Sequence, residues 1–200
     1  MEIITREYTV YDFSELSEDA KEVVRQWYLN DETRPEIFTE NIDYFLSENF
    51  GKSELKVQYD LGYCQGDGLN IYGKFELSDM LDKISFDDFS EKEKRFIFWA
   101  IKNYPNTGKI PANNHYCYCI ADQGDYTGNL IYDLENCGIR DINYKALEKF
   151  EAACIDYFEK LCNEYAEDGY KYFYEADDAE IEEACSVNDW KFTENGKFFY

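Results

Sequence analysis

The sequence predicts an α+β protein in which an antiparallel sheet built from hairpins is covered by helices. Segments with apolar residues at helical spacing alternate with β-rich segments, and Gly-containing turns join the β-rich segments in pairs. Two of these turns are alike, Gln65–Gly68 and Gln123–Asp125. A duplicated helix–hairpin unit would explain the likeness, and so would independent use of the same turn chemistry.

The N-terminal region reads as a strand followed by two helices. Residues Ile3–Val10 are β-rich and alternate in polarity, which predicts a strand. Ser17 precedes an acidic first turn and then apolar residues at helical spacing, so it is the expected N-cap of the first helix. Thr33–Pro35 ends that helix, and a second runs over Glu36–Asn49 until Gly51 stops it.

The next segments predict a hairpin and a helix. Strands are expected over Glu54–Tyr63 and Leu69–Leu77, joined by the Gln65–Gly68 turn. A short helical turn over Ser78–Ile84 follows, and Ser90 precedes a helix over Glu91–Tyr104.

A second hairpin is predicted from His115–Ala121 and Tyr126–Leu134. The longest helix is expected from about Asp141 to Tyr165, with a break at Gly169.

The C-terminal part predicts an acidic helix over Asp177–Cys185 and a hairpin over Trp190–Tyr200, turning at Glu194–Gly196. We therefore expect an α+β domain over residues 1–140, and over 141–200 an acidic helical segment that packs with it as one unit.

The charge of the chain is its most unusual property. Asp and Glu number 43 and Lys and Arg number 20 in 200 residues, a net charge of −23. A net charge of magnitude roughly 2–8 keeps a small domain soluble, so this larger excess of acids needs another explanation. Such a surface repels nucleic acid and anionic membranes and attracts basic protein surfaces. Direct nucleic-acid binding and membrane insertion are accordingly not expected.

Composition indicates a folded protein of a reducing compartment. The 15 Phe, 19 Tyr and 3 Trp exclude an acidic disordered chain. The segment Met1–Arg6 lacks a basic and an apolar region, so we expect a cytoplasmic protein, in a bacterial host. The seven cysteines are then expected as thiols, with Cys154 and Cys162 buried on one helical face.

Metal and catalytic motifs are weak. On the expected strand, His115, Cys117 and Cys119 would share one face, as in half of a zinc site, but no second pair is present. The stretch Asp122–Asp133 departs from the EF-hand pattern. We expect no metal, no cofactor and no enzyme activity.

One carboxylate pair is an alternative to this expectation. Asp67 and Asp125 occupy corresponding turns, so a metal-dependent enzyme would be built on them. The competing interpretation is that each satisfies backbone groups of its own turn.

The acidic C-terminal third is the best candidate for a binding surface. Carboxylates spaced along helices can approximate the charge density of a DNA backbone, and Tyr is enriched at protein interfaces. The expected partner-contacting acids lie in the region 164–183, and they are Glu164, Glu167, Asp168, Glu175, Asp177, Asp178, Glu180, Glu182 and Glu183.

The segment Tyr11–Lys21, with its Glu-Leu-Ser-Glu-x-Ala-Lys sequence, and the later Gln65–Gly68 hairpin resemble a module of small uncharacterised phage and prophage proteins. The resemblance covers roughly residues 8–77 and implies a mobile-element origin. In charge and size the chain is also similar to phage-encoded DNA mimics of the antirestriction and anti-CRISPR type.

These observations together predict an anti-defence protein. It would bind a basic nucleic-acid-binding protein, such as a CRISPR or restriction nuclease complex, as an acidic DNA mimic. A homodimeric regulatory module, formed through the aromatic-rich sheet, is the alternative that the sequence does not separate from it.

Overall fold

The structure, a computed structural model, describes residues 6–199. Its contacts divide the chain into two compact units. The central unit comprises Phe38–Gly169, and the terminal unit comprises Met1–Ile37 with Tyr170–Tyr200. This division differs from the expected one at residue 140, because the N-terminal and C-terminal segments pack together. The class is α+β, as predicted.

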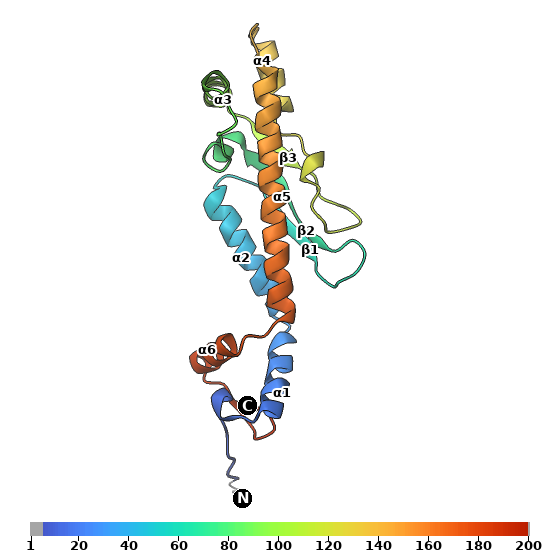
Figure 1. Cartoon of the computed structure of the whole chain (residues 1–200), viewed down its shortest axis with the longest axis vertical. Helices are drawn as coiled ribbons and strands as arrows, with labels where there is room; N and C mark the ends of the chain where they lie inside the picture. Colours follow the sequence, from blue (N-terminus) through green and yellow to red (C-terminus); the bar gives the residue numbers. More distant parts are fainter. Residues whose placement is uncertain (1–5, 200) are drawn as a thin grey trace, which may run out of the picture. The chain divides into compact units, whose positions relative to one another are not determined.

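A three-stranded antiparallel sheet lies in the central unit (Figure 1). Strand β1 (Lys56–Asp60) and strand β2 (Gly68–Glu76) form the predicted hairpin, with Tyr59 opposite Leu69. Strand β3 (Thr107–Ile110) pairs with the second half of β2. The sequence predicts no strand at this position.

The helices of the central unit follow the predicted order with shifted ends. Helix α2 (Arg34–Asn49) begins before its expected start and enters the central unit at Phe38. A 3-10 helix η2 (Leu77–Asp82) and helix α3 (Glu91–Asn103) come next. Ser90 caps α3 as predicted, and Glu93 completes a capping box with it.

Helix α5 (Tyr144–Tyr174) is longer than expected and passes Gly169 without a break. Gly169 is needed for close packing, since a Cβ there would lie 2.4 Å from Leu61 and 2.9 Å from Phe38. On the same helix Phe158 is fully buried and meets Phe75 of β2, with ring centroids 5.0 Å apart. The central core is thus a cluster of aromatic rings between α5 and the sheet. Cys154 and Cys162 are buried on this face, as predicted.

The second predicted hairpin is wrong. Residues 115–120 form no strand, a 3-10 helix η3 (Ala121–Gln123) follows, and the expected returning strand is helix α4 (Gly128–Asn136). Leu130 and Leu134 are both fully buried, and their separation by four residues is the spacing of a helix. The alternating polarity that predicted a strand here is not matched by a partner strand. A duplicated helix–hairpin unit is therefore not present.

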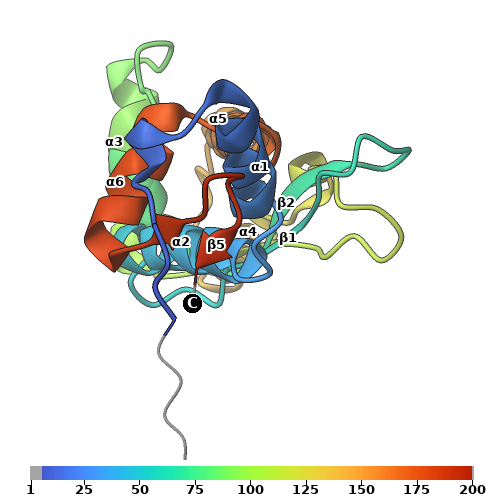
Figure 2. The same ribbon diagram turned by 90° about the horizontal axis from the view of Figure 1, so that it is seen from below.

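The segment 111–120 is instead held as a loop by one buried side chain. Asn70 of β2 is fully buried. Its amide nitrogen donates to the carbonyl of Pro111 at 3.2 Å, and its carbonyl oxygen accepts from the N–H of Ile120 at 3.1 Å. One residue therefore fixes both ends of the loop, which lies beside the β1–β2 turn (Figures 1 and 2).

The terminal unit joins both ends of the chain. It contains η1 (Phe13–Glu15), helix α1 (Glu18–Leu29), helix α6 (Asp178–Asn188) and the paired strands β4 (Lys191–Phe192) and β5 (Phe198–Phe199). Ser17 caps α1 as predicted, and the C-terminal hairpin is confirmed. The core of this unit is formed by residues of both segments, namely Phe13, Leu16, Ala20, Val24, Ile181, Cys185 and Phe192.

The expected N-terminal strand is not found in the described residues. Residues 6–10 have no strand conformation, and Ile3–Thr5 lie outside the described part. Tyr11 alone forms a β-bridge, and its partner is Phe192, with N–O distances of 2.8 and 3.0 Å. The β-rich composition of this segment therefore yields a single bridge to the C-terminal hairpin.

Candidate acidic partner-binding surface

Acidic charge is most concentrated in the terminal unit. Its sequence holds 18 acidic and 7 basic residues among 68, a net charge of −11, whereas the central unit carries −12 over 132 residues. Even if every basic side chain of the protein neutralised one acid, 23 acids would keep their charge. Both units therefore present acids that internal ion pairs cannot balance.

Three of the expected contact acids have structural roles in the terminal unit. Asp178 forms a two-point ion pair with Arg25, with distances of 2.7 and 2.8 Å, and the Arg25 side chain is 19% exposed. Asp177 caps α6, because its carboxylate accepts from the N–H of Ala179 at 2.9 Å. These acids stabilise the unit, so their loss would disturb folding as well as any interface.

Glu180 accepts a 2.8 Å hydrogen bond from the Tyr28 hydroxyl. Burial and this hydrogen bond raise the pKa of Tyr28 to about 12, so the phenol stays protonated at neutral pH. The remaining expected acids of this unit, Glu175, Glu182 and Glu183, are exposed. They are the better candidates for contact with a partner.

In the central unit, the expected acids Glu164, Glu167 and Asp168 lie exposed on α5. With Asp156 and Glu159 they make five acids in 13 residues, which is about 20 Å of helix. That is about one carboxylate per 4 Å, close to the 3.4 Å per charge along one DNA strand. At 100° per residue the five occupy about half of the helix circumference. We call these five residues the α5 acidic row.

Asp67 and Asp125 are not brought together. Asp125 lies beside Lys109, which pairs with Lys74, whereas Asp67 precedes the other end of β2. Seven strand residues separate the two positions, which corresponds to about 23 Å. The geometry therefore offers no carboxylate pair for the alternative enzyme.

Each of these aspartates serves its own turn, as the competing interpretation expected. Asp125 accepts a 2.9 Å hydrogen bond from the N–H of Gly128, the first residue of α4. The Asp67 carboxylate accepts from the N–H of Cys64 at 2.8 Å.

His115, Cys117 and Cys119 do not share a strand face, because no strand forms there. The Cys117 N–H donates to the Gly66 carbonyl at 3.0 Å, which joins the loop to the β1–β2 turn. Cys119 is half-buried beside Cys162, and the hydrogen bond between the two thiols together with burial raises the pKa of Cys162. The shared face that a strand would have given these three residues is therefore not formed.

Another group in the described residues has the donor types for a cation. Ligand atoms of Asp60, Cys64 and Asp67 lie within 4.8 Å of one another. The Cys64 thiol donates to Asp67 at 2.9 Å, and this hydrogen bond raises the thiol pKa. A protonated thiol beside the exposed Asp60 and the half-buried Asp67 accounts for the arrangement without a metal.

Sequence reasoning missed the aromatic contact between the two loops. Tyr116 and Tyr118 stack with ring centroids 5.6 Å apart, and both remain partly exposed. They pack on the glycines of the β1–β2 turn, since a Cβ on Gly66 would lie 2.0 Å from Tyr116 and one on Gly68 2.8 Å from Tyr118. The Gln65–Gly68 turn was visible in the sequence, but the residues that pack on it were not.

Comparison with known proteins adds no relative: no family model, no curated protein and no solved structure matches the chain. Among the described residues, none of the helices combines the length and apolar character needed to cross a bilayer. The surface chemistry is therefore the basis for a functional proposal.

Proposed function

We propose that this protein is an acidic ligand of a basic nucleic-acid-binding protein and inhibits it by occupying the surface that would bind DNA. The expected class of target is a nuclease complex of a bacterial defence system, and the proposed role is that of a phage or mobile-element inhibitor. The observation that carries the proposal is the spacing of the α5 acidic row, about one carboxylate per 4 Å of helix.

Competition would work through charge and exclusion. Lys and Arg side chains that neutralise phosphates would meet carboxylates instead, and the two ligands would not bind at once. Complementary charge speeds association and makes it sensitive to salt. The acids to test are exposed members of the expected contact set, namely Glu164, Glu167, Asp168, Glu175, Glu182 and Glu183.

The test is capture of a target and release by DNA. The full chain is immobilised, nuclease-treated bacterial lysate is applied at low salt, and bound proteins are eluted with duplex DNA or a salt gradient. We expect mass spectrometry to identify a nucleic-acid-binding nuclease in the DNA eluate, and the free protein to inhibit that nuclease when added to its assay.

Charge-matched variants separate a defined surface from bulk charge. The test variants neutralise three acids each, on α5 (Glu164→Gln, Glu167→Gln, Asp168→Asn) or near α6 (Glu175→Gln, Glu182→Gln, Glu183→Gln). The control neutralises three exposed acids of α2 (Glu40→Gln, Asp43→Asn, Glu48→Gln). At least one test variant should elute at lower salt than the control. Equal weakening by all three, or no protein displaced by DNA, would contradict the proposal.

A further inference from the structure

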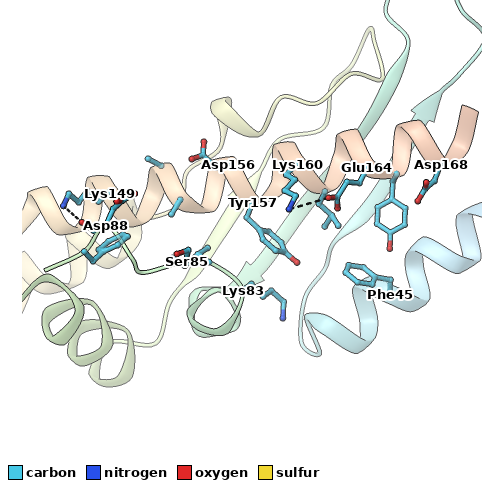
Figure 3. A pocket seen from close by; sticks show the side chains of 16 residues that line it. Phe45, Lys83, Ser85, Asp88, Lys149, Asp156, Tyr157, Lys160, Glu164 and Asp168 are labelled. Carbon is cyan, nitrogen blue, oxygen red and sulfur yellow. Dashed lines mark hydrogen bonds and ion pairs between the residues drawn. The ribbon is translucent and has the colours of Figure 1, made fainter. Parts of the chain in front are cut away.

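A long groove runs along α5 in the central unit (Figure 3). Its lining on α5 extends from Lys149 to Asp168, which is about 29 Å of helix. The opposite wall is the segment from Lys83 to Phe89, and Phe45 of α2 closes one end. The volume is about 870 Å³. The groove is therefore as long as about five helical turns.

The floor of the groove is apolar. It is formed by Phe45, Ile84, Phe89, Ala153, Tyr157 and Leu161. Ala152 and Ala153 add no bulk, so the α5 wall is low near its Lys149 end. A series of apolar and aromatic side chains of this length matches the face of an amphipathic helix, which presents apolar residues every three or four positions.

Both rims of the groove are acidic. On the α5 rim lie Asp156, Glu164 and Asp168. The opposite wall contributes Asp88, and its neighbour Asp87 is exposed as well. A cationic side chain on either flank of a helix in the groove would thus meet a carboxylate.

Three lysines also line the groove, and each has an internal contact. Lys149 donates to Glu93 and to the Asp88 carbonyl, both at 3.1 Å. Lys83 lies over the Phe50 ring, 4.9 Å from its centroid. Lys160 pairs with Glu164 at 3.6 Å, and both side chains are exposed, so the pair is weak and a partner can replace it.

The two tyrosines that line the groove stay neutral. Burial raises the pKa of Tyr157 and of Tyr165, and nearby Glu164 acts in the same direction. Their hydroxyls therefore remain hydrogen-bond donors beside an apolar surface, as is common at protein interfaces.

We infer that this groove binds an amphipathic helix of the partner, with its apolar face on the floor and basic side chains along both acidic rims. The inference rests on the proposed function, because it specifies how a basic protein would engage α5. Helices rich in Lys and Arg are common nucleic-acid-binding elements, so a groove with this pattern would occupy the element itself.

The test uses a defined probe. A fluorescein-labelled peptide of 20 residues carries Leu at i, i+3, i+4 and i+7 spacing and Arg or Lys on both flanks, and its scrambled version has the same composition. Fluorescence anisotropy with the full chain should give a dissociation constant about tenfold lower for the amphipathic peptide than for the scrambled one. Equal affinities would show attraction to bulk charge and overturn the inference.

Variants locate the binding. Ala152→Trp fills the groove from an exposed position, and it should weaken the peptide about tenfold while circular dichroism stays unchanged. Glu164→Gln with Asp168→Asn should weaken it about threefold to tenfold. The matched control, Asp141→Asn with Glu148→Gln, removes two exposed acids outside the groove and should leave affinity unchanged. Full binding by Ala152→Trp would overturn the inference.

The same variant separates this inference from the proposed function. If Ala152→Trp captures a DNA-displaced nuclease as well as the unaltered protein does, the target is bound elsewhere and the groove inference fails alone. If neither the unaltered protein nor Ala152→Trp captures a DNA-displaced nuclease, while the amphipathic peptide still binds the groove, the proposed function fails. The groove then remains a helix-binding site.

Discussion

At the scale of single residues, the β1–β2 turn depends on a glycine that packs against Tyr116. Gly66 has a φ of +95°, and an added Cβ would lie 2.0 Å from the Tyr116 ring. We expect Gly66→Ala to lower the free energy of unfolding by about 2–4 kcal/mol, because backbone strain and overlap add. Urea unfolding measures the change.

The control is Gly138, which has a φ of +72° but open space around it. Gly138→Ala should cost only about 1 kcal/mol, from backbone strain alone. Equal losses in the two variants would show that contact with Tyr116 contributes nothing.

A second residue-scale prediction concerns acid stability. The backbone N–H and hydroxyl of Ser90, together with Lys149, lower the pKa of Glu93 from 4.5 to about 2. A lowered folded-state pKa stabilises the protein above the unfolded value, and that contribution disappears as the pH falls from about 4.5 to about 2.

The substitution Glu93→Gln should therefore reduce stability at neutral pH and make the fall in stability across this pH range shallower. Thermal unfolding at pH 7, 5, 4 and 3 measures both effects. Parallel pH profiles for the two proteins would contradict the role of Glu93.

At the scale of elements, α5 owes its length to its buried face. Phe158 is fully buried and contacts the rings of Phe50 and Phe75. Phe158→Ala should lower the free energy of unfolding by about 3–5 kcal/mol, through lost burial and an unfilled cavity. Tyr44→Ala, at a side chain that is 68% exposed, should change it by less than about 0.5 kcal/mol. Urea unfolding of both variants tests this.

Elements were predictable where local signals agree. Ser17 and Ser90 marked helix starts, and the Gly-containing turn marked the first hairpin, because capping and turn chemistry act over a few residues. The strands predicted over 115–121 and 126–134 are wrong, because alternating polarity specifies a strand only when a partner strand exists. Asn70, which holds the first of these as a loop, is 41 and 50 residues from its two partners.

The candidate site was predictable only in part. Which acids lie on helices follows from periodicity, so Glu164, Glu167 and Asp168 could be placed on α5. The roles of Asp178 and Glu180 could not, since their partners Arg25 and Tyr28 are more than 150 residues away. The groove along α5 could not be predicted either, because its opposite wall comes from another part of the chain.

At the scale of the whole molecule, self-repulsion is the dominant electrostatic effect. With a net charge of −23, the folded state gains from screening. Raising NaCl from 0.1 to 1 M shortens the screening length from about 10 to about 3 Å. If about 1–2 kcal/mol of repulsion is screened, the Tm should rise by about 2–8 °C.

Choline chloride is the control for specific cation binding. Screening depends on ionic strength, so both salts should raise the Tm equally in a thermal scan. A larger rise with Na⁺ would indicate bound cations, and a fall with either salt would contradict net self-repulsion.

The pairing of the two chain ends in the terminal unit has a consequence for synthesis. Val24 and its neighbours on α1 are buried against Ile181, Cys185 and Phe192. On the ribosome, the N-terminal segment emerges first but finds its partners only after residue 192 has left the exit tunnel. The central unit, contiguous in sequence, can fold earlier. The nascent chain would thus carry α1 without its buried partners until α6 and β4 have been made, so α1 would reach its native packing after the central unit.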